Sequence, residues 1–203
     1  MAPTKKINTP SATFSPWTAG LAPLVQREQF IRDALEQRGV LEDAYHPELK
    51  KVQTENANKL RPMLEQRGFP VLSSAGEEGV RLSWLIIHHA VSLPDFMRTC
   101  LDQMRMAAAQ DDYPRDLLAY TEDKICFLEG RDQLFGTHFD WVAGELKPTP
   151  IGDEKFLDER RKAAGLPPMA ESLPRVSHVP PPKDPSQKAV ELDAWLKAVG
   201  WRV

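Results

Sequence analysis

Two adjacent histidines, His88 and His89, stand inside an otherwise apolar stretch, SWLIIHHA at 83–90. Imidazole takes and releases protons near neutral pH, so both residues are candidate general acids or bases. A single histidine on an apolar helix is more often a core residue that hydrogen-bonds a carbonyl or carboxylate. A buried imidazole without a partner costs roughly 1–3 kcal/mol, so packing alone is a poor reason for two in succession. The pair therefore favours a functional site modestly.

A carboxylate shares one helical face with His89. Glu78 precedes His89 by eleven positions, which at about 100° per residue places both side chains on the same face, about 16 Å apart along the axis. The two cannot touch, but they could line one groove from opposite ends. His88 and His89 point in different directions, so one helix cannot bring both to a single metal ion.

A second polar segment, QLFGTHFD at 133–140, follows downstream. Gly136 permits a tight or positive-φ turn, from which Thr137 and His138 would project. Small polar residues on a glycine turn beside aromatic residues are typical of a ligand-contacting loop. A plain β-turn with a surface histidine is an equally good interpretation.

Several other residues could support such a site. Asp123 could orient a histidine, although a solvent-facing ion pair is the simpler alternative. The predicted site comprises catalytic His89, His138, His88, Glu78 and Asp123, and substrate-binding Gln133, Thr137, Trp84 and Phe135.

Familiar catalytic and cofactor motifs are absent from the sequence. It contains no H-E-x-x-H, CxxC, Walker loop, GxGxxG or GxSxG. We therefore expect no cofactor, with a divalent metal or haem bound through His88, His89 or His138 as a minority alternative.

Apolar residues at helical spacing predict the elements that position these side chains. Pro62 should kink or divide the second helix, because proline lacks an N–H and crowds the preceding turn. The predicted helices cover about 24–38, 47–68, 76–91, 94–108, 114–130, 153–164 and 186–199, with a β-hairpin or extended loop near 131–151.

These elements predict a mainly α, single-domain bundle of about five to seven helices. The predicted divisions are a flexible tail at 1–22, a helical core at 23–170, a proline-rich linker at 171–185 and an amphipathic helix at 186–203. The last helix must pack on its own domain or on a second copy, so a homodimer through it is possible.

Composition excludes several classes of protein. The chain has 203 residues, 41% hydrophobic and 27% charged, with a net charge of −3. This is enough apolar material for a core, and the weak negative charge argues against a nucleic-acid partner. Without an apolar stretch that suits a signal peptide or a membrane span, we expect a cytoplasmic protein with no membrane partner.

Four segments of the sequence together carry a family resemblance: SWLIIHHA at 83–90, GEEG at 76–79, LAYTEDKI at 118–125 and DQLFGTHF at 132–139. They resemble a bacterial family known as domain of unknown function 6624, and the similarity runs over 45–169.

The family pattern reads W-L-I-x-Q-H-A and Q-x-Y-G-T-Q. His89, Gln133 and Thr137 match it, whereas His88 and His138 stand where glutamine is common and Phe135 replaces a tyrosine. The resemblance implies a mostly α-helical bacterial protein and brings no established reaction.

Three hypotheses follow. The first is a small-molecule enzyme, for example one of specialised metabolism, that uses histidine acid–base chemistry for hydrolysis, elimination or cyclisation, with His89 as the principal group. The second is a non-catalytic binding or accessory protein that acts through its C-terminal helix. The third is a metal or haem protein with histidine ligands.

Overall fold

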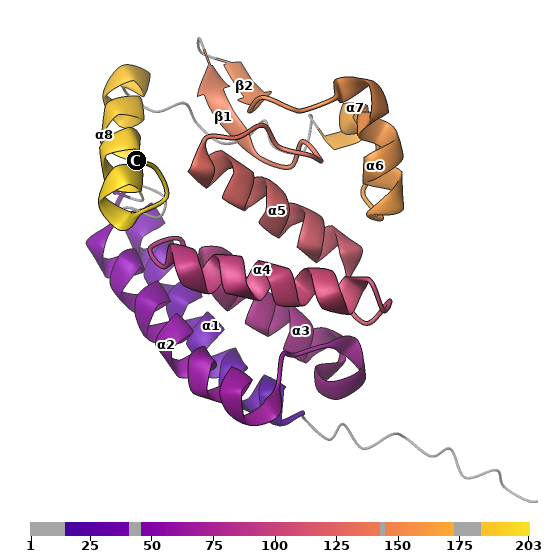
Figure 1. The fold of residues 1–203 in the computed structure, drawn as a ribbon. Coiled ribbons are helices and arrows are strands. Elements are labelled where there is room, and N and C mark those ends of the chain that lie inside the picture. Colours follow the sequence, from indigo (N-terminus) through magenta and orange to yellow (C-terminus); the bar gives the residue numbers. More distant parts are fainter. Residues whose placement is uncertain (1–14, 41–45, 143–144, 173–183) are drawn as a thin grey trace, which may run out of the picture.

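The computed structural model describes residues 15–40, 46–142, 145–172 and 184–203, and it confirms a mainly α fold (Figure 1). The described part of the chain contains eight α-helices, one short 3₁₀ helix and one two-stranded hairpin. In chain order these are α1 (Pro16–Gln37), α2 (Pro47–Arg67), α3 (Leu72–His89), α4 (Pro94–Ala108), α5 (Arg115–Glu129), β1 (Phe139–Val142), β2 (Glu145–Pro148), η2 (Glu154–Phe156), α6 (Leu157–Ala163), α7 (Met169–Ser172) and α8 (Pro185–Val199).

Helix α3 lies at the centre of the molecule. It packs against α1, α2, α4 and α5, and Ile86 and Ile87 in its apolar half are fully buried. A helix that is apolar on nearly every face needs neighbours on every side, which is why this one forms the middle of the bundle. The backbone of His88 and His89 is therefore held in place by a tightly packed helix.

Helix α1 begins at Pro16, eight residues earlier than the predicted Leu24. The Ser15 side chain accepts a hydrogen bond from the Trp17 N–H, and Pro16 occupies the first turn, where a missing N–H costs nothing. Trp17 is buried in the main core. The first fourteen residues of the predicted tail lie outside the described residues.

Helix α2 continues through Pro62, so the predicted division is wrong. Pro62 has no N–H to donate to the Asn58 carbonyl four residues earlier. Both residues are exposed, so water can satisfy that carbonyl. The break occurs instead in α3, where Gly76 has φ 68° and ψ 171°. Such a positive φ suits glycine alone.

The predicted hairpin is confirmed. Strands β1 and β2 pair antiparallel, with Phe139 opposite Pro148 and Val142 opposite Glu145. Figure 1 shows the hairpin above α5, on the side of the bundle that also carries α8. The loop at 133–138 therefore connects α5 directly to this edge.

Helix α8 packs on its own domain. Asp184 accepts hydrogen bonds from two N–H groups of its first turn, as predicted, and Leu196 is fully buried. Beyond its end, the Trp201 indole N–H donates to the Val91 carbonyl at 2.6 Å, and Arg202 donates to carbonyls at the end of α5. These contacts fix α8 beside α5 and the hairpin.

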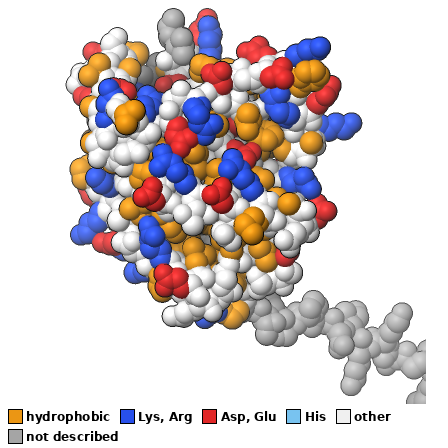
Figure 2. All heavy atoms as spheres, in the orientation of Figure 1, with side chains coloured by type: hydrophobic (Ala, Val, Ile, Leu, Met, Phe, Trp, Pro, Cys, Tyr) orange, Lys and Arg blue, Asp and Glu red, His pale blue; other side chains and the backbone are white. Residues whose placement is uncertain are grey.

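The outer surface carries charges of both signs. Figure 2 shows Lys and Arg side chains interspersed with Asp and Glu on the visible face, as a net charge of −3 suggests. Among the described residues, no helix is both long and apolar enough to cross a membrane.

Candidate functional site

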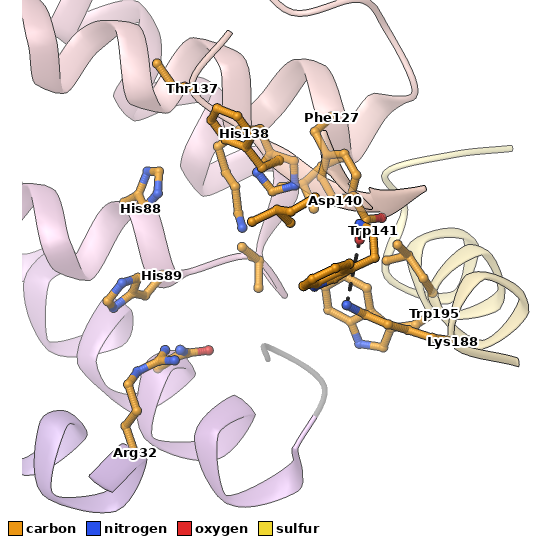
Figure 3. Close-up of a pocket in the computed structure, with 17 residues that line it drawn as sticks. Arg32, His88, His89, Phe127, Thr137, His138, Asp140, Trp141, Lys188 and Trp195 are labelled. Atoms are coloured by element: carbon orange, nitrogen blue, oxygen red, sulfur yellow. Dashed lines mark hydrogen bonds and ion pairs between the residues drawn. The ribbon is translucent and has the colours of Figure 1, made fainter. Parts of the chain in front are cut away.

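A cavity of about 440 Å³ lies between α1, α3, α5, the hairpin and α8 (Figure 3). Its lining includes four of the predicted site residues: His88, His89, Thr137 and His138. The central helix and the glycine turn therefore face a common space, as the sequence predicted. Cavities of this size hold small molecules.

His89 is paired with a carboxylate that the sequence did not point to. Its Nδ1 lies 2.8 Å from Oε1 of Glu28 on α1; the His89 side chain is 30% exposed and that of Glu28 is 5% exposed. Glu78, the predicted partner, is exposed on α3 and does not line the cavity. The predicted role of Glu78 is therefore wrong, because a neighbouring helix supplies the carboxylate.

Glu28 is itself held by two buried amides of α2. Gln53 Nε2 donates to Oε1 at 3.0 Å, and Asn56 Nδ2 donates to Oε2 at 3.2 Å. Burial raises the pKa of Glu28, but the hydrogen bond and charge of His89 and the hydrogen bond of Gln53 outweigh it and hold that pKa below its ordinary value. A fixed carboxylate thus orients the imidazole through Nδ1, and no described residue hydrogen-bonds its Nε2.

His88 is a half-buried imidazole whose Nδ1 is shielded from solvent. Burial, followed by the positive charge of Lys124 and the neighbouring histidines, lowers its pKa well below the ordinary value. Its ring stacks on Trp84 with centroids 4.9 Å apart, and its Nδ1 has no hydrogen-bond partner among the described residues. The indole N–H of Trp84 donates to Leu117 O and Thr121 Oγ1, which fixes the ring. Trp84 does not line the cavity, so it supports the stacked His88 ring from outside.

His138 is also neutral. Burial, then the charges of Lys124 and Lys188, lower its pKa to about 3, and its ring lies 3.8 Å from that of Phe127. At neutral pH neither His138 nor His88 carries a proton to donate as an imidazolium. We therefore correct their predicted role from acid–base partners to neutral hydrogen-bonding groups.

Asp123 holds the glycine turn and does not orient a histidine. This fully buried carboxylate accepts hydrogen bonds from the N–H groups of Leu134 and Phe135 and from both the N–H and the hydroxyl of Thr137. Gly136 has φ 66°, the positive value that the sequence predicted. Asp123 thus determines where Thr137 stands.

Gln133 has a similar positioning role. Its side chain is fully buried; Nε2 donates to the carbonyls of His138 and Thr149, and Oε1 accepts from the His138 N–H. It fixes the main chain of His138 and cannot contact a substrate. Phe135 packs against a small core cluster of Ala119 on α5 and Ala164 and Leu166 just after α6, and it does not line the cavity. Both predicted substrate-binding roles are wrong.

Positive charge predominates in the cavity. Arg32, Lys124 and Lys188 line it, whereas Asp140 is the one carboxylate among the described lining residues. Asp140 lies 3.9 Å from Lys188, and Figure 3 shows Arg32 on the opposite side, near His89. The arrangement favours an anionic ligand.

One sequence signal could have revealed Glu28. Leu21, Glu28 and Leu35 follow one another at seven-residue spacing on α1, and all three are buried. A carboxylate in the middle of an apolar stripe needs a partner, since acidic side chains are seldom fully buried alone. Arg32 carried no comparable signal.

Metal ligands do not converge here. Within the described ranges, no three or more His, Cys, Asp or Glu side chains lie close enough to hold a metal ion. The rings of His88 and His89 are 6.0 Å apart.

A family model described as a family of unknown function (DUF6624) matches residues 20–178. The chain therefore belongs to this family. Comparisons with curated proteins and with solved structures gave no match. The matched residues include Glu28, Arg32, His89 and the glycine turn, whereas α8 lies beyond them.

Proposed function

We propose that this DUF6624 protein is an enzyme that transfers protons on a small-molecule substrate, with His89 as general base and general acid. The observation that carries the proposal is the contact between Glu28 and His89 at the wall of the cavity. A carboxylate bound to one imidazole nitrogen leaves the other nitrogen to act on a ligand.

Glu28 acts as a positioning residue in this mechanism. Its carboxylate accepts from Nδ1–H, so the lone pair of the neutral imidazole resides on Nε2. When Nε2 takes a proton from a substrate O–H or C–H, or from water, the electron pair stays on the atom that loses the proton. The adjacent carboxylate stabilises the resulting imidazolium, which then returns the proton to a leaving group or product. Such catalysis typically contributes about 10²–10⁴-fold in rate.

The remaining polar groups suit the negative charge that develops on the substrate. Arg32 and Lys124 line the same cavity, and a positive charge near a developing anion stabilises the transition state. The Thr137 hydroxyl donates to Asp123, which also accepts from main-chain N–H groups of the glycine turn, so we assign this hydroxyl a structural role. Hydrolysis, elimination and cyclisation all fit a site of this kind, and none of them requires a bound cofactor.

A binding or accessory role through α8 has less support. The face of α8 that contains Leu192 and Leu196 is buried within its own chain, so a partner would have to use the outer face. There Val190 is 71% exposed. A single exposed valine is ordinary surface and does not indicate an interface.

The test combines a defined metabolite library with two matched carboxylate variants. Once turnover of a compound is found by mass spectrometry, His89→Gln should lower kcat at least about 100-fold, and Glu28→Gln should lower it at least about tenfold by weakening the orientation of the ring. Glu78→Gln, on the exposed face of α3, should leave kcat unchanged. Wild-type turnover by His89→Gln would refute the proposal.

Nitrogen NMR of the histidine side chains gives a second measurement. At a pH high enough for the ring to be neutral, the proposed geometry requires hydrogen on Nδ1 of His89 in the wild type, and a mixture of tautomers in Glu28→Gln. A wild-type imidazole with hydrogen on Nε2 would contradict the assigned role of Glu28.

A further inference from the structure

We propose that the cavity selects a small molecule with an anionic group at one end and a flat apolar group at the other, and that α8 supplies the apolar selectivity. This inference rests on the proposed function, since it describes the substrate of His89. Figure 3 shows the two ends: Arg32, His88 and His89 on one side, and Trp141 and Trp195 on the other.

The polar end suits an anion. Arg32 lies beside His89 at this end, and Lys124 also lines the cavity. The one carboxylate among the described lining residues, Asp140, lies 3.9 Å from Lys188 on the opposite side. The buried Nδ1 of His88 has no hydrogen-bond partner among the described residues. A ligand polar group could satisfy this nitrogen, which otherwise loses its hydration without compensation.

The apolar end is built from aromatic and aliphatic side chains of three elements. Phe127 comes from α5, Trp141 and Leu146 from the hairpin, and Leu192 and Trp195 from α8. The buried indole N–H of Trp141 also has no acceptor among the described residues. A flat ligand with one acceptor would fill this end and satisfy that N–H.

The apolar end continues beyond the main cavity. A second hollow of about 210 Å³ lies between the hairpin and α8 and shares Phe127, Trp141 and Leu192 with the first. The hairpin and α8 are therefore not packed tightly against each other at this point. The adjoining space gives room for an apolar substituent of the ligand.

The family match includes the residues of the proposed chemistry and part of the apolar wall, but not α8. Glu28, Arg32 and His89 lie within residues 20–178. Phe127, Trp141 and Leu146 also lie within them, whereas Leu192 and Trp195 lie beyond. Trp201 nevertheless anchors α8 to the family region through the Val91 carbonyl. We infer that the matched region supplies proton transfer and that α8 determines which apolar group is accepted.

Binding of simple arylalkanoates tests this inference without knowledge of the natural substrate. Isothermal titration of the full chain would compare phenylacetate, 3-phenylpropionate and 4-phenylbutyrate with their amides and with butyrate. We expect at least one aryl acid to bind, and its amide and butyrate to bind about tenfold more weakly or worse. Failure of all three acids to bind, or equal binding of acid and amide, would overturn the proposal.

Variants assign each end of the ligand to its wall. Arg32→Gln should abolish the difference in affinity between the aryl acid and its amide. Leu192→Trp fills the apolar end, so it should weaken binding of the aryl acid about tenfold and leave binding of butyrate unchanged. Lys197→Gln, an exposed change on α8, is the matched control and should bind as the wild type does. An unchanged aryl preference in Leu192→Trp would refute the role of α8.

His89→Gln separates this inference from the proposed function. It should retain binding of the aryl acid even though it loses turnover. If His89→Gln keeps both binding and turnover, the acid–base assignment fails and the ligand class stands. If no aryl acid binds the wild type while His89 proves essential for turnover of another compound, the ligand class fails and the assignment stands.

Discussion

Acidification should destabilise this protein through His138, and His138→Gln should remove that effect. The folded state holds the pKa of His138 at about 3, against an ordinary value of 6.5. Between these values the unfolded chain binds a proton that the folded chain does not, so the free energy of unfolding falls as pH falls from about 6.5 towards 3. Glutamine is a suitable replacement because it is polar and neutral at every pH.

The size of the effect follows from the two pKa values. At about pH 5 the unfolded imidazole is about 97% protonated and the folded one about 1%, which lowers the free energy of unfolding by about 2 kcal/mol relative to pH 7.5. The substitution leaves the local backbone contacts intact, because Gln133 binds the main-chain N–H and carbonyl of residue 138. The pKa of His88 is also lowered by burial. Because His88 is present in both proteins, its contribution to the pH dependence cancels in the comparison.

Urea unfolding followed by circular dichroism, at about pH 7.5 and about pH 5, measures this difference. The wild type should lose about 2 kcal/mol more than His138→Gln between the two conditions. Any constant effect of the substitution on packing disappears in the comparison. Equal losses in the two proteins would show that His138 accepts a proton in the folded state, and the assignment of a neutral ring would be refuted.

Three further predictions concern the supports of the site. Asp123→Asn should lower the free energy of unfolding by about 2–4 kcal/mol in urea, because the amide cannot accept every hydrogen bond of the glycine turn; the exposed Asp132→Asn is the control. Trp201→Phe removes the bond to the Val91 carbonyl and should cost about 1–3 kcal/mol in thermal unfolding, and an unchanged Tm would show that α8 is held elsewhere. The pKa of Glu28 is lowered in the folded state, so its carboxylate contributes fully to the free energy of unfolding above about pH 4.5. This contribution is lost as the pH falls through the pKa of the folded state. The free energy of unfolding of Glu28→Gln, measured in urea as the pH is lowered, should lack this loss.

Local signals explain why most helices and the hairpin could be predicted. Asp184 and Gly200 delimit α8, and Gly130 ends α5, as their residue types require. The start of α1 was missed because Ser15 and Pro16, its cap and first turn, resemble the proline-rich residues before them. Local pattern does not show which side chains the bundle will bury, and burial of Trp17 decides that boundary.

Side-chain partners could not be predicted in the same way. The sequence placed His89 and His138 at one cavity correctly, because a central helix and the loop after a neighbouring helix must meet. It gave Asp123 and Gln133 the wrong roles, since their bonds go to main-chain groups that leave no pattern in residue type. Glu28 lies sixty-one positions before its partner, and such pairs arise only from tertiary packing.

His88 and His138 do not add a second acid–base centre. Burial and neighbouring positive charge lower the pKa of both rings, so each acts as a neutral hydrogen-bonding side chain. A low-dielectric wall near Lys124 cannot stabilise further cations. Among the described imidazoles that line the cavity, His89 alone contacts a carboxylate. The proposed proton chemistry therefore belongs to His89 and Glu28, which both lie within the matched residues, and His88 and His138 form other parts of the cavity wall.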